Sequence, residues 1–330
     1  MSGGDVTVIV PVWNRRELLE GLLRCLRAQT QAIAGILVVD DGSEDGTAQF
    51  AESLGPRVIR MDVHGGFARA VNSGIRESRT PLVAIVNNDV KLAPDWLEKL
   101  LAGLDEGAWF ATGKILQDSD TNRIDATYDL VCRGGTAWRV GHGCLDGPAF
   151  REAREIRFAP FTAALFRAEL FDKVGPLDER FESYLEDVDF GMRCALAGCG
   201  GRYVPDAVAW HAGSATLGRW HPETTRLMAR NQVFLVAKHY SGTMLWRCAW
   251  SVAVGQGLWG LVALRHGRGG AWLRGKAEGL GRWRELRGPA GVRGSKILRE
   301  GEREIRRVQR ESGPDLYWTL YFLLTAGGAK

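Results

Sequence analysis

The sequence predicts an α/β fold in which a mostly parallel sheet is flanked by helices and followed by a helical C-terminal extension. Between residues 6 and about 104, short runs of β-branched residues alternate with stretches of helical periodicity, which is typical of βαβ units. The strand-like runs are largely apolar, as expected for strands buried on both faces of a parallel sheet. After about residue 240 the strand pattern stops, and Trp and Arg become frequent.

The predicted elements of the first part follow one another in a regular order. The strands are "VTVIVPV" (6–12), "GILVVD" (35–40), "RVIRM" (57–61) and "PLVAIV" (81–86). The helices are "RRELLEGLLRCLRAQ" (15–29), "GTAQFAESL" (46–54) and "GFARAVNSGIRES" (66–78). Because ligands of such sheets bind at the carboxyl ends of the strands, we expect the polar residues found there to line one rim. They are Asn14, Asp40, Asp41, His64 to Gly66 and Asn87 to Asp89.

The middle of the chain is less regular. Residues 109–158 contain extended pieces joined by a Gly-rich turn in "DLVCRGGTAWRVG", which predicts a strand-rich insert. A helix led by acidic residues, "YLEDVDFGMR", is then predicted to end near Gly198, and a strand, "GRYVPDAVAWH", carries His211 at its end. These segments place carboxylates and an imidazole where side chains can converge.

The composition limits the class of protein. With 330 residues, 45% of them hydrophobic and 25% charged, the chain is long enough for one large domain or two smaller ones, and disorder is not expected. The formal charge is +4, and the excess of Lys and Arg lies late in the chain, which favours a local basic face for anionic lipid or a phosphate-bearing substrate over general nucleic-acid binding. Six scattered cysteines without a CxxC pair, and an N-terminus without the pattern of a signal peptide, predict a cytoplasmic protein with reduced thiols.

The segment that begins "TMLWRCAW" interleaves Trp with Arg and Lys. Its apolar stretch, "CAWSVAVGQGLWGLVAL", is shorter than the roughly 20 residues that a transmembrane helix needs, and Gln256 interrupts it. An interfacial helix pair, with Trp at the level of the lipid headgroups and Arg on the polar face, fits this pattern and predicts a peripheral position on the inner face of the cell membrane. The alternative is a helical hairpin packed on the rest of the protein, or a homodimer interface built from the same aromatic residues.

Two motifs of the first part could contact a nucleotide. In "LVVDDGSEDGT", Asp40 and Asp41 could accept from a base N–H or a ribose hydroxyl, or they could form an N-cap and turn. In "VHGGFARAVNSGI", the backbone N–H groups of Gly65 and Gly66 at a helix start suit a phosphate, although the same glycines also suit a simple tight turn.

The acidic helix "YLEDVDFGMR" offers a second kind of chemistry. Glu186 and Asp187 are adjacent, and neighbouring carboxylates can have pKa values that are pushed apart, which suits one of them as a general base. Asp189 and Arg193 are four positions apart, and this spacing predicts a structural i,i+4 ion pair.

Asp89 in "NNDV" and His211 in "AWHAG" could together hold a divalent metal that neutralises a departing diphosphate. Considered alone, His211 would be a structural histidine. Asn87 and Asn88 add no negative charge beside Asp89, so the sequence predicts a weak metal site that is completed largely by the diphosphate of the ligand.

Seven motifs follow one another between residues 6 and 238: "VIVPVWNR", "VVDDGS", "GGFARAVNSGI", "VNNDV", "VGPLDERFESYLEDVDFGMR", "WH" and "ARNQ". As a set they resemble inverting family 2 glycosyltransferases, and most of all the rhamnosyltransferase-like branch. The resemblance implies a GT-A type, Rossmann-like fold, a nucleotide-sugar donor, a divalent metal (Mg²⁺ or Mn²⁺) and transfer of the sugar to an acceptor hydroxyl with inversion. It also implies a catalytic domain at 1–240, with a nucleotide-sugar half at about 1–110 and an acceptor half at about 111–240, and an extension at 241–330.

The resemblance implies roles for individual residues. Asp89 and His211 would bind the metal, and Asp187, or less favourably its neighbour Glu186, would be the general base. The residues implied to contact the nucleotide-sugar are Pro11, Asn14, Asp40, Asp41, Gly66, Phe67, Asn72, Asn88 and Asp89.

The resemblance favours dTDP-rhamnose as the donor, with a UDP-sugar as the alternative, and a cell-surface glycan or lipid-linked precursor as the acceptor. The alternative function is a noncatalytic glycan or nucleotide-sugar binding protein that keeps the fold. The motif "NND" supports it, because relatives often have two or three acidic residues there. A nucleotidyltransferase on a related sheet would need a Gly-rich phosphate loop with a basic residue, and "VPVWNRREL" lacks that glycine pattern.

Overall fold

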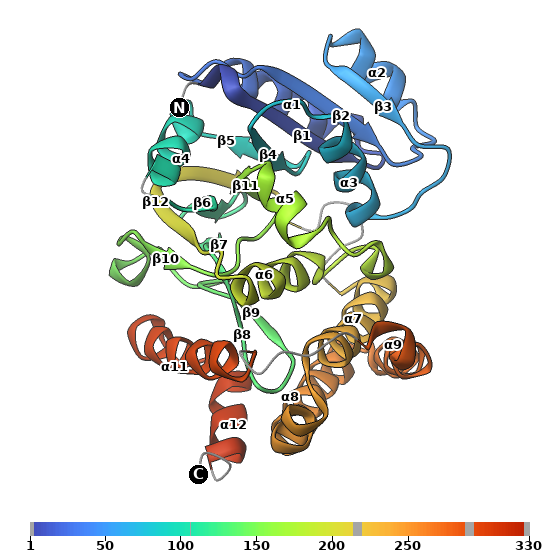
Figure 1. The fold of residues 1–330 in the computed structure, drawn as a ribbon, viewed down its shortest axis with the longest axis vertical. Coiled ribbons are helices and arrows are strands. Elements are labelled where there is room, and N and C mark those ends of the chain that lie inside the picture. The colour runs from blue at the N-terminus through green and yellow to red at the C-terminus, as the bar shows by residue number, and fades with distance from the viewer. Residues whose placement is uncertain (1–2, 106, 214–219, 288–293, 327–330) are drawn as a thin grey trace. The chain divides into compact units, whose positions relative to one another are not determined.

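The computed structural model describes residues 3–105, 107–213, 220–287 and 294–326, and the chain forms two compact units (Figure 1). The first unit consists of Met1–Asp129 and Gly141–Thr216, and the second of Leu130–Val140 and Leu217–Lys330. Among the helices described, none has the length and apolar character needed to span a membrane.

The first unit is built on a ten-stranded sheet. Its strands are β1 (Val6–Val12), β2 (Gly35–Asp40), β3 (Arg57–Arg60), β4 (Leu82–Val86), β5 (Val90–Leu92), β6 (Phe110–Gln117), β7 (Ile124–Ala126), β10 (Arg154–Ile156), β11 (Ala163–Arg167) and β12 (Gly201–His211). The order is β10-β12-β6-β11-β4-β1-β2-β3, with β5 paired to β12 and β7 to β6. Strands β1 to β4 are mutually parallel, β6 is parallel to β12, and β11 runs antiparallel between β4 and β6. The predicted mostly parallel sheet is confirmed.

Helices flank this sheet. They are α1 (Arg16–Arg27), α2 (Thr47–Ser53), α3 (Phe67–Glu77), α4 (Trp96–Asp105), α5 (Glu169–Val174) and α6 (Glu186–Leu196), with short 3-10 turns at Gly3–Asp5, Pro148–Phe150 and Glu179–Phe181. The leucines at positions 19, 22, 23 and 26 bury one face of α1, which is the spacing of an amphipathic helix. Helix α3 approaches β1 closely, because a Cβ placed on Gly74 would lie 2.5 Å from the side chain of Ile9.

The irregular middle of the chain is rich in strands, as predicted. It contains β6, β7 and β10 of the large sheet, and β8 (Asp129–Val131) pairs with β9 (Ala137–Arg139) in a separate two-stranded sheet. The acidic helix α6 ends at Leu196, just before Gly198, and β12 ends at His211, so both predictions for this region are confirmed.

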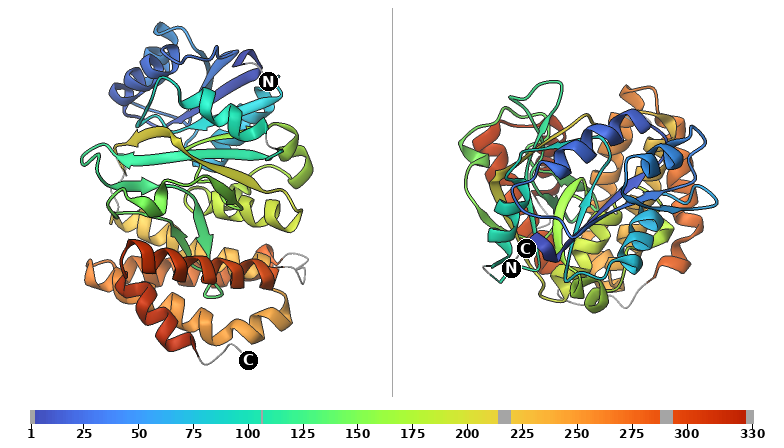
Figure 2. Two further views of the ribbon diagram at one scale, coloured as in Figure 1. Left: turned by 90° about the vertical axis from the view of Figure 1, so that its left-hand side faces the viewer. Right: turned by 90° about the horizontal axis from the view of Figure 1, so that it is seen from above.

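The second unit is helical, as the sequence predicts for the C-terminal part. Its helices are α7 (Pro222–His239), α8 (Gly242–Arg265), α9 (Gly269–Gly281), α10 (Trp283–Leu286), α11 (Gly294–Ser312) and α12 (Leu316–Thr325). Helix α9 packs tightly on α7, because a Cβ on Gly275 would lie 2.1 Å from the carbonyl oxygen of Arg226. Cys132, Ile305, Trp318 and Tyr321 form part of a hydrophobic core in this unit. Figure 2 shows α11 and α12 in red beside α8 in orange.

Candidate active site

The carboxyl ends of β1, β2, β3 and β4 lie on one edge of the sheet, because these neighbouring strands run in the same direction. Strand β12 also runs in this direction, since it is parallel to β6, and β6 and β4 are both antiparallel to β11. The segments that follow these strands therefore gather at one edge, where parallel sheets commonly bind ligands. A surface pocket bounded by Thr7, Gly35 and Thr80 lies at the amino ends of the same strands and is separate from this edge.

The carboxylate of Asp41 shapes the turn between β3 and α3. Its Oδ1 accepts a hydrogen bond from the backbone N–H of Gly65 and its Oδ2 from that of Gly66, both at 2.8 Å. Nδ1 of His64 lies 2.8 Å from the same Oδ2, and this hydrogen bond raises the pKa of His64 although partial burial opposes the rise. The His64 ring stacks on Trp13 with a centroid distance of 4.0 Å. Asp41 thus aligns two backbone amides at the start of α3.

Gly66 occupies a backbone conformation that is essentially restricted to glycine, with φ 90° and ψ 166°. A Cβ at this position would lie 2.9 Å from the backbone carbon and oxygen of Glu182. The backbone N–H of Ala68 donates to the Glu182 carbonyl at 2.8 Å, and that of Phe67 donates to Ser183 Oγ at 3.1 Å. The start of α3 is therefore fastened to the loop that leads into α6.

Asp40 has a buried oxygen that no described residue satisfies. Its side chain is 3% exposed, and Oδ2 accepts a long hydrogen bond of 3.4 Å from the backbone N–H of Ser43, whereas Oδ1 has no hydrogen-bond partner within the described residues. Buried carboxylate oxygens are normally paired, so this atom is a candidate acceptor for a ligand N–H or hydroxyl.

Two other residues predicted to contact the nucleotide-sugar lie near the end of β1. Asn14 lies in the left-handed region with φ 58°, and its backbone N–H donates to Ser43 Oγ at 2.7 Å. Pro11 is buried within β1 opposite Val39.

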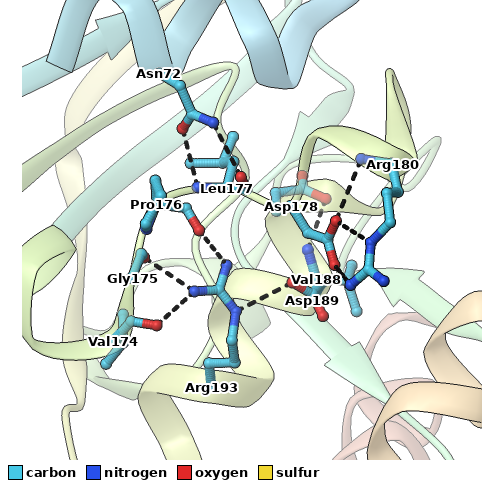
Figure 3. A network of polar contacts seen from close by, with 11 residues as sticks. Asn72, Val174, Gly175, Pro176, Leu177, Asp178, Arg180, Val188, Asp189 and Arg193 are labelled. Carbon is cyan, nitrogen blue, oxygen red and sulfur yellow. Dashed lines mark hydrogen bonds and ion pairs between the residues drawn. The ribbon is translucent and has the colours of Figure 1, made fainter. Parts of the chain in front are cut away.

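Asn72 connects α3 to the segment that precedes α6 (Figure 3). Its Nδ2 donates to the carbonyl of Leu177 at 2.9 Å, and its Oδ1 accepts from the backbone N–H of the same residue at 2.9 Å. The Nδ2 group also donates to Glu179. These bonds account for the amide as a structural link, and its predicted contact with the nucleotide-sugar stays a prediction.

The guanidinium of Arg193 fixes the same segment from the other side (Figure 3). It donates to the carbonyl oxygens of Val174, Gly175 and Pro176 at 2.6, 2.9 and 2.8 Å, and it pairs with Asp189 at 3.1 Å. The predicted i,i+4 ion pair is confirmed. The three carbonyl contacts could not be predicted from helical spacing, because they join residues on different elements.

The acidic pair Glu186 and Asp187 occupies the first turn of α6, and both side chains are buried. Oδ1 of Asp187 accepts from the backbone N–H of Val188 at 2.8 Å. The loop before them is strained, since Tyr184 and Leu185 both have positive φ, at 70° and 67°. Non-glycine residues in this conformation cluster at functional sites. The start of α6 favours negative charge because the first N–H groups of a helix have no partner within the helix and carry a partial positive charge.

His211 lies between two carboxylates. Its Nε2 is 3.2 Å from Oδ1 of Asp89, between β4 and β5, and its Nδ1 is 2.8 Å from Oδ2 of Asp125, in β7. Burial lowers the pKa of His211, but the hydrogen bonds to Asp125 and Asp89 outweigh this effect and raise the pKa to about 9. Nδ1 of His142 also lies near Asp125, 3.5 Å from its Oδ1.

The structure thus brings the predicted metal ligands Asp89 and His211 together and adds Asp125, which the sequence pattern does not single out. The available signal was an acidic residue between Ile124 and Ala126, both buried, in a short strand. Asp125 is itself buried, which suits a carboxylate that acts on a neighbouring imidazole.

The metal site suggested by Asp89 and His211 is sparse. Over the described ranges, no three His, Cys, Asp or Glu side chains are arranged to hold one metal ion. Asn87, two residues before Asp89, has a buried Oδ1 without a hydrogen-bond partner among the described residues, and Asn88 is half-buried. A carboxylate, an imidazole and a nearby amide oxygen suit Mg²⁺ or Mn²⁺ if a ligand supplies further oxygens.

The chain matches a protein family and several known proteins. A model of the family "Glycosyl transferase family 2" matches residues 7–175, a span that ends before Asp187 and His211. An N-acetylglucosaminyl-diphospho-decaprenol L-rhamnosyltransferase of Mycobacterium tuberculosis is 28% identical over 298 residues, which cover 80% of this chain and 96% of that protein. Glycosyltransferase AglE of Haloferax volcanii is 27% identical over 214 residues, which cover 62% of this chain and 66% of that protein.

Two solved structures share the fold. A mannosyltransferase of Pyrobaculum calidifontis in complex with GDP-Man and Mn²⁺ aligns with a TM-score of 0.52 and 18% identity, covering 99% of this chain and 88% of that one. GalNAc-T7 with UDP, GalNAc and Mn²⁺ aligns with a TM-score of 0.60 and 11% identity, covering 98% of this chain and 56% of that one.

Proposed function

The chain belongs to glycosyl transferase family 2 and has a GT-A fold, and from this membership we propose that it moves a sugar from a nucleoside-diphosphate sugar to an acceptor hydroxyl in a single inverting displacement. The observation that carries the proposal is the arrangement at the carboxyl edge of the sheet. There Asp40 has an oxygen without a hydrogen-bond partner in the described part of the chain, the N–H groups of Gly65 and Gly66 are aligned by Asp41, and Asp89 faces His211.

In this proposal the nucleotide lies across the ends of β1 and β2. Asp40 Oδ1 accepts from the base or the ribose, and Asn14 and Pro11 lie near the same strand ends. Gly66 and Phe67 lie where the diphosphate or the sugar approaches the start of α3, and Asn88 lies beside Asp89. Asp41 acts on the bound nucleotide-sugar indirectly, through the glycine turn that it holds.

Asp89 and His211 would hold a divalent metal, with Asn87 nearby. Such an ion, when bound, neutralises negative charge on the departing diphosphate. Both solved neighbours contain Mn²⁺ together with a nucleotide or nucleotide sugar, which supports the same ligand classes here. Asp125 holds the imidazole of His211 by a hydrogen bond to Nδ1, which leaves Nε2 directed at Asp89.

Asp187 is the proposed general base, with Glu186 as the alternative. The acceptor oxygen attacks the anomeric carbon while the bond from that carbon to the diphosphate oxygen breaks, and the acceptor proton passes to the carboxylate. The contact of the loop at Glu182 and Ser183 with the start of α3 ties the acidic turn to the glycine turn, so the base and the donor pocket are fixed in one framework.

The donor that we favour is dTDP-rhamnose, which would supply rhamnose, and a UDP-sugar is the alternative. The M. tuberculosis relative is an L-rhamnosyltransferase named for an N-acetylglucosaminyl-diphospho-decaprenol, which supports rhamnose and a lipid-linked acceptor. The proposed catalytic region is residues 1–240, and the proposed extension is residues 241–330. We place the protein on the inner face of the cell membrane as a peripheral enzyme of polysaccharide or cell-wall synthesis.

A donor panel tests this proposal. The purified chain is incubated with dTDP-rhamnose or UDP-sugars, with Mn²⁺, Mg²⁺ or a chelator, and released nucleoside diphosphate is measured. We expect metal-dependent release from one donor. When an acceptor is added, Asp187→Asn should slow transfer by a factor of roughly 10²–10⁴, while Asp172→Asn, at an exposed position of α5, should not. The alternative is a noncatalytic binding protein, which the sparse metal site favours. Such a protein would show a raised thermal midpoint with that donor and no release of nucleoside diphosphate.

A further inference from the structure

Helix α11 carries a continuous basic row on its exposed face. The row consists of Lys296, Arg299, Arg303, Arg306 and Arg310, all exposed and separated alternately by three and four positions. The opposite face of the helix is buried through Ile297, Leu298, Ile305 and Val308. The row therefore faces away from the core of the second unit.

The acidic residues of α11 do not neutralise the arginines of this row. Glu302 is buried and accepts from Arg133 and Tyr321. Glu304 and Glu311 both pair with Arg307, which lies off the row. Within the described residues, the row's single ion pair is a contact of 3.9 Å between Lys296 and Glu300. Four guanidinium groups are thus available to an anionic partner.

A second exposed row, on α8, is apolar over the length of the helix. It consists of Trp246, Trp250, Ala253, Gly257, Leu261 and Leu264. Trp246 is 84% exposed and Leu264 is 64% exposed. Helix α12 adds Leu316, Leu323 and Leu324, also exposed. Of the eleven exposed large hydrophobic residues in the described chain, nine belong to the second unit, so they are concentrated rather than scattered as single surface residues usually are.

Helix α12 joins the two rows into one surface. The indole Nε1 of Trp250 donates to the carbonyl of Leu324 at 2.9 Å, so the apolar row of α8 meets the end of α12. The guanidinium of Arg306 stacks over the ring of Phe322 at 3.9 Å, so the basic row meets the same part of α12 from the other side. Figure 2 shows the three helices adjacent to one another. We call this surface, formed by the two rows and the exposed leucines of α12, the α11–α12–α8 face.

We propose that the α11–α12–α8 face binds an anionic lipid bilayer, with α11 lying along the membrane. The arginines contact lipid phosphates, for which the guanidinium geometry is suited, and the exposed Trp and Leu side chains enter the boundary between headgroups and acyl chains. The charge pattern argues against a second copy of the chain as the partner. In a symmetric dimer the same face of both copies would meet, so five cations of one copy would lie against five of the other. A nucleic acid would use the basic row alone and leave the apolar row exposed.

The proposed membrane contact uses different helices from those that the sequence predicts. The sequence pattern places it in the Trp- and Arg-rich segment, which forms α8 and α9. Helix α9 instead turns Gly275 and Gly279 onto α7, and its Trp272 packs on Gly260 of α8. The basic side of the surface is provided by α11, which lies outside that segment. Membrane binding at this face would bring the enzyme to a lipid-linked acceptor, and this part of the inference rests on the proposed function.

Flotation with vesicles, without any sugar donor, tests the proposal separately from catalysis. We expect the full chain to bind vesicles of phosphatidylcholine with phosphatidylglycerol and to bind phosphatidylcholine alone far more weakly, with a loss of binding at high salt. Replacing Arg299, Arg303 and Arg310 with Gln should weaken binding roughly 100-fold, while Arg306 is kept because it stacks on Phe322. The matched control replaces three exposed arginines of the first unit with Gln, at Arg16, Arg24 and Arg151. It has the same net charge as the first triple variant, but it should bind vesicles like the wild type.

A second variant tests the exposed apolar side chains of α8 and α12. Trp246→Ser with Leu323→Ser should reduce binding to anionic vesicles, while circular dichroism and the thermal midpoint stay near wild type because both side chains are exposed.

Three results would overturn the proposal. The first is an equal loss of vesicle binding in the two arginine triple variants, and the second is binding to heparin without binding to vesicles. The third is a dimer in sedimentation that the serine variant dissociates. Intact lipid binding without donor turnover would contradict the proposed function alone.

Discussion

Nδ1 of His211 lies 2.8 Å from Oδ2 of Asp125, a residue 86 positions earlier in the chain. The contact joins the end of β12 to the short strand β7, and it leaves the other ring nitrogen 3.2 Å from Asp89. Asp125 therefore sets the orientation of the imidazole at the proposed metal site.

Replacing Asp125 with Asn should weaken the metal site without unfolding the protein. An amide has one acceptor atom instead of two, so it holds the His211 ring less firmly, and we expect metal affinity to fall roughly 10–100-fold. Calorimetric titration of Mn²⁺ in the presence of a nucleoside diphosphate measures this. Asp118→Asn, at a residue that binds Lys91 at the surface, is the matched control and should leave the affinity unchanged. Equal affinities in the two variants would show that Asp125 does not act on the site.

Asp187→Asn should separate chemistry from donor binding. If the carboxylate removes the acceptor proton, kcat should fall by a factor of roughly 10²–10⁴ while the affinity for the donor is retained. Glu186→Gln should then have the smaller effect. Steady-state transfer kinetics with both variants assigns the base, and a wild-type kcat in both would remove the acidic pair from the mechanism.

Gly66→Ala should destabilise the protein more than an alanine at another glycine with positive φ. Both the backbone conformation and the approach of 2.9 Å to Glu182 disfavour a Cβ at residue 66, and together they should cost roughly 2–6 kcal/mol. Gly46 has φ 81° with no atom within 4 Å of the added Cβ, so Gly46→Ala should cost only about 1–2 kcal/mol. Urea unfolding compares them. Similar losses in the two variants would mean that contact with Glu182 does not constrain the turn.

Lys276 should make the stability of the protein depend on pH. Burial lowers the pKa of its ammonium group from 10.5 to about 7, even though Nζ donates to Gln232 at 2.9 Å and to Gln256. Between these pH values the unfolded chain binds a proton that the folded chain lacks, so this residue's contribution to the free energy of unfolding increases as the pH rises from 7 to 10.5.

Lys276→Met should therefore be more stable than the wild type near pH 7, and this advantage should shrink toward pH 10. Thermal midpoints across this range measure the effect, and Lys296→Met, at an exposed position, should follow the wild-type profile. A constant difference between Lys276→Met and wild type at all pH values would contradict the lowered pKa.

The parts of the fold that depend on local pattern could be predicted. The runs around Val8, Leu37 and Ala84 indicate buried strands because they are apolar and short, and the alternation with helices indicates parallel pairing. The antiparallel insertion of β11 between β4 and β6 could not, because it pairs β11 with a strand about 80 residues earlier, and a helix and several other strands lie between them in the chain.

The candidate site divides in the same way. Asp40, Gly66 and Asp89 follow strands and could be located by position alone. Asp125 could not, because its strand has three residues and its partner lies far along the chain. The carbonyl contacts of Arg193 and the structural bonds of Asn72 are long-range too, and the identity of their partners depends on tertiary packing.

Inverting sugar transfer is tested most directly by a reaction followed by NMR, with dTDP-rhamnose, Mn²⁺ and an N-acetylglucosaminyl diphosphate lipid as acceptor. UDP-sugars are run in parallel. We expect one donor to yield nucleoside diphosphate and a new glycosidic bond in equal amounts, with the anomeric configuration inverted. A donor that binds but yields no glycosidic bond under any metal condition, or a product with retained configuration, would contradict it.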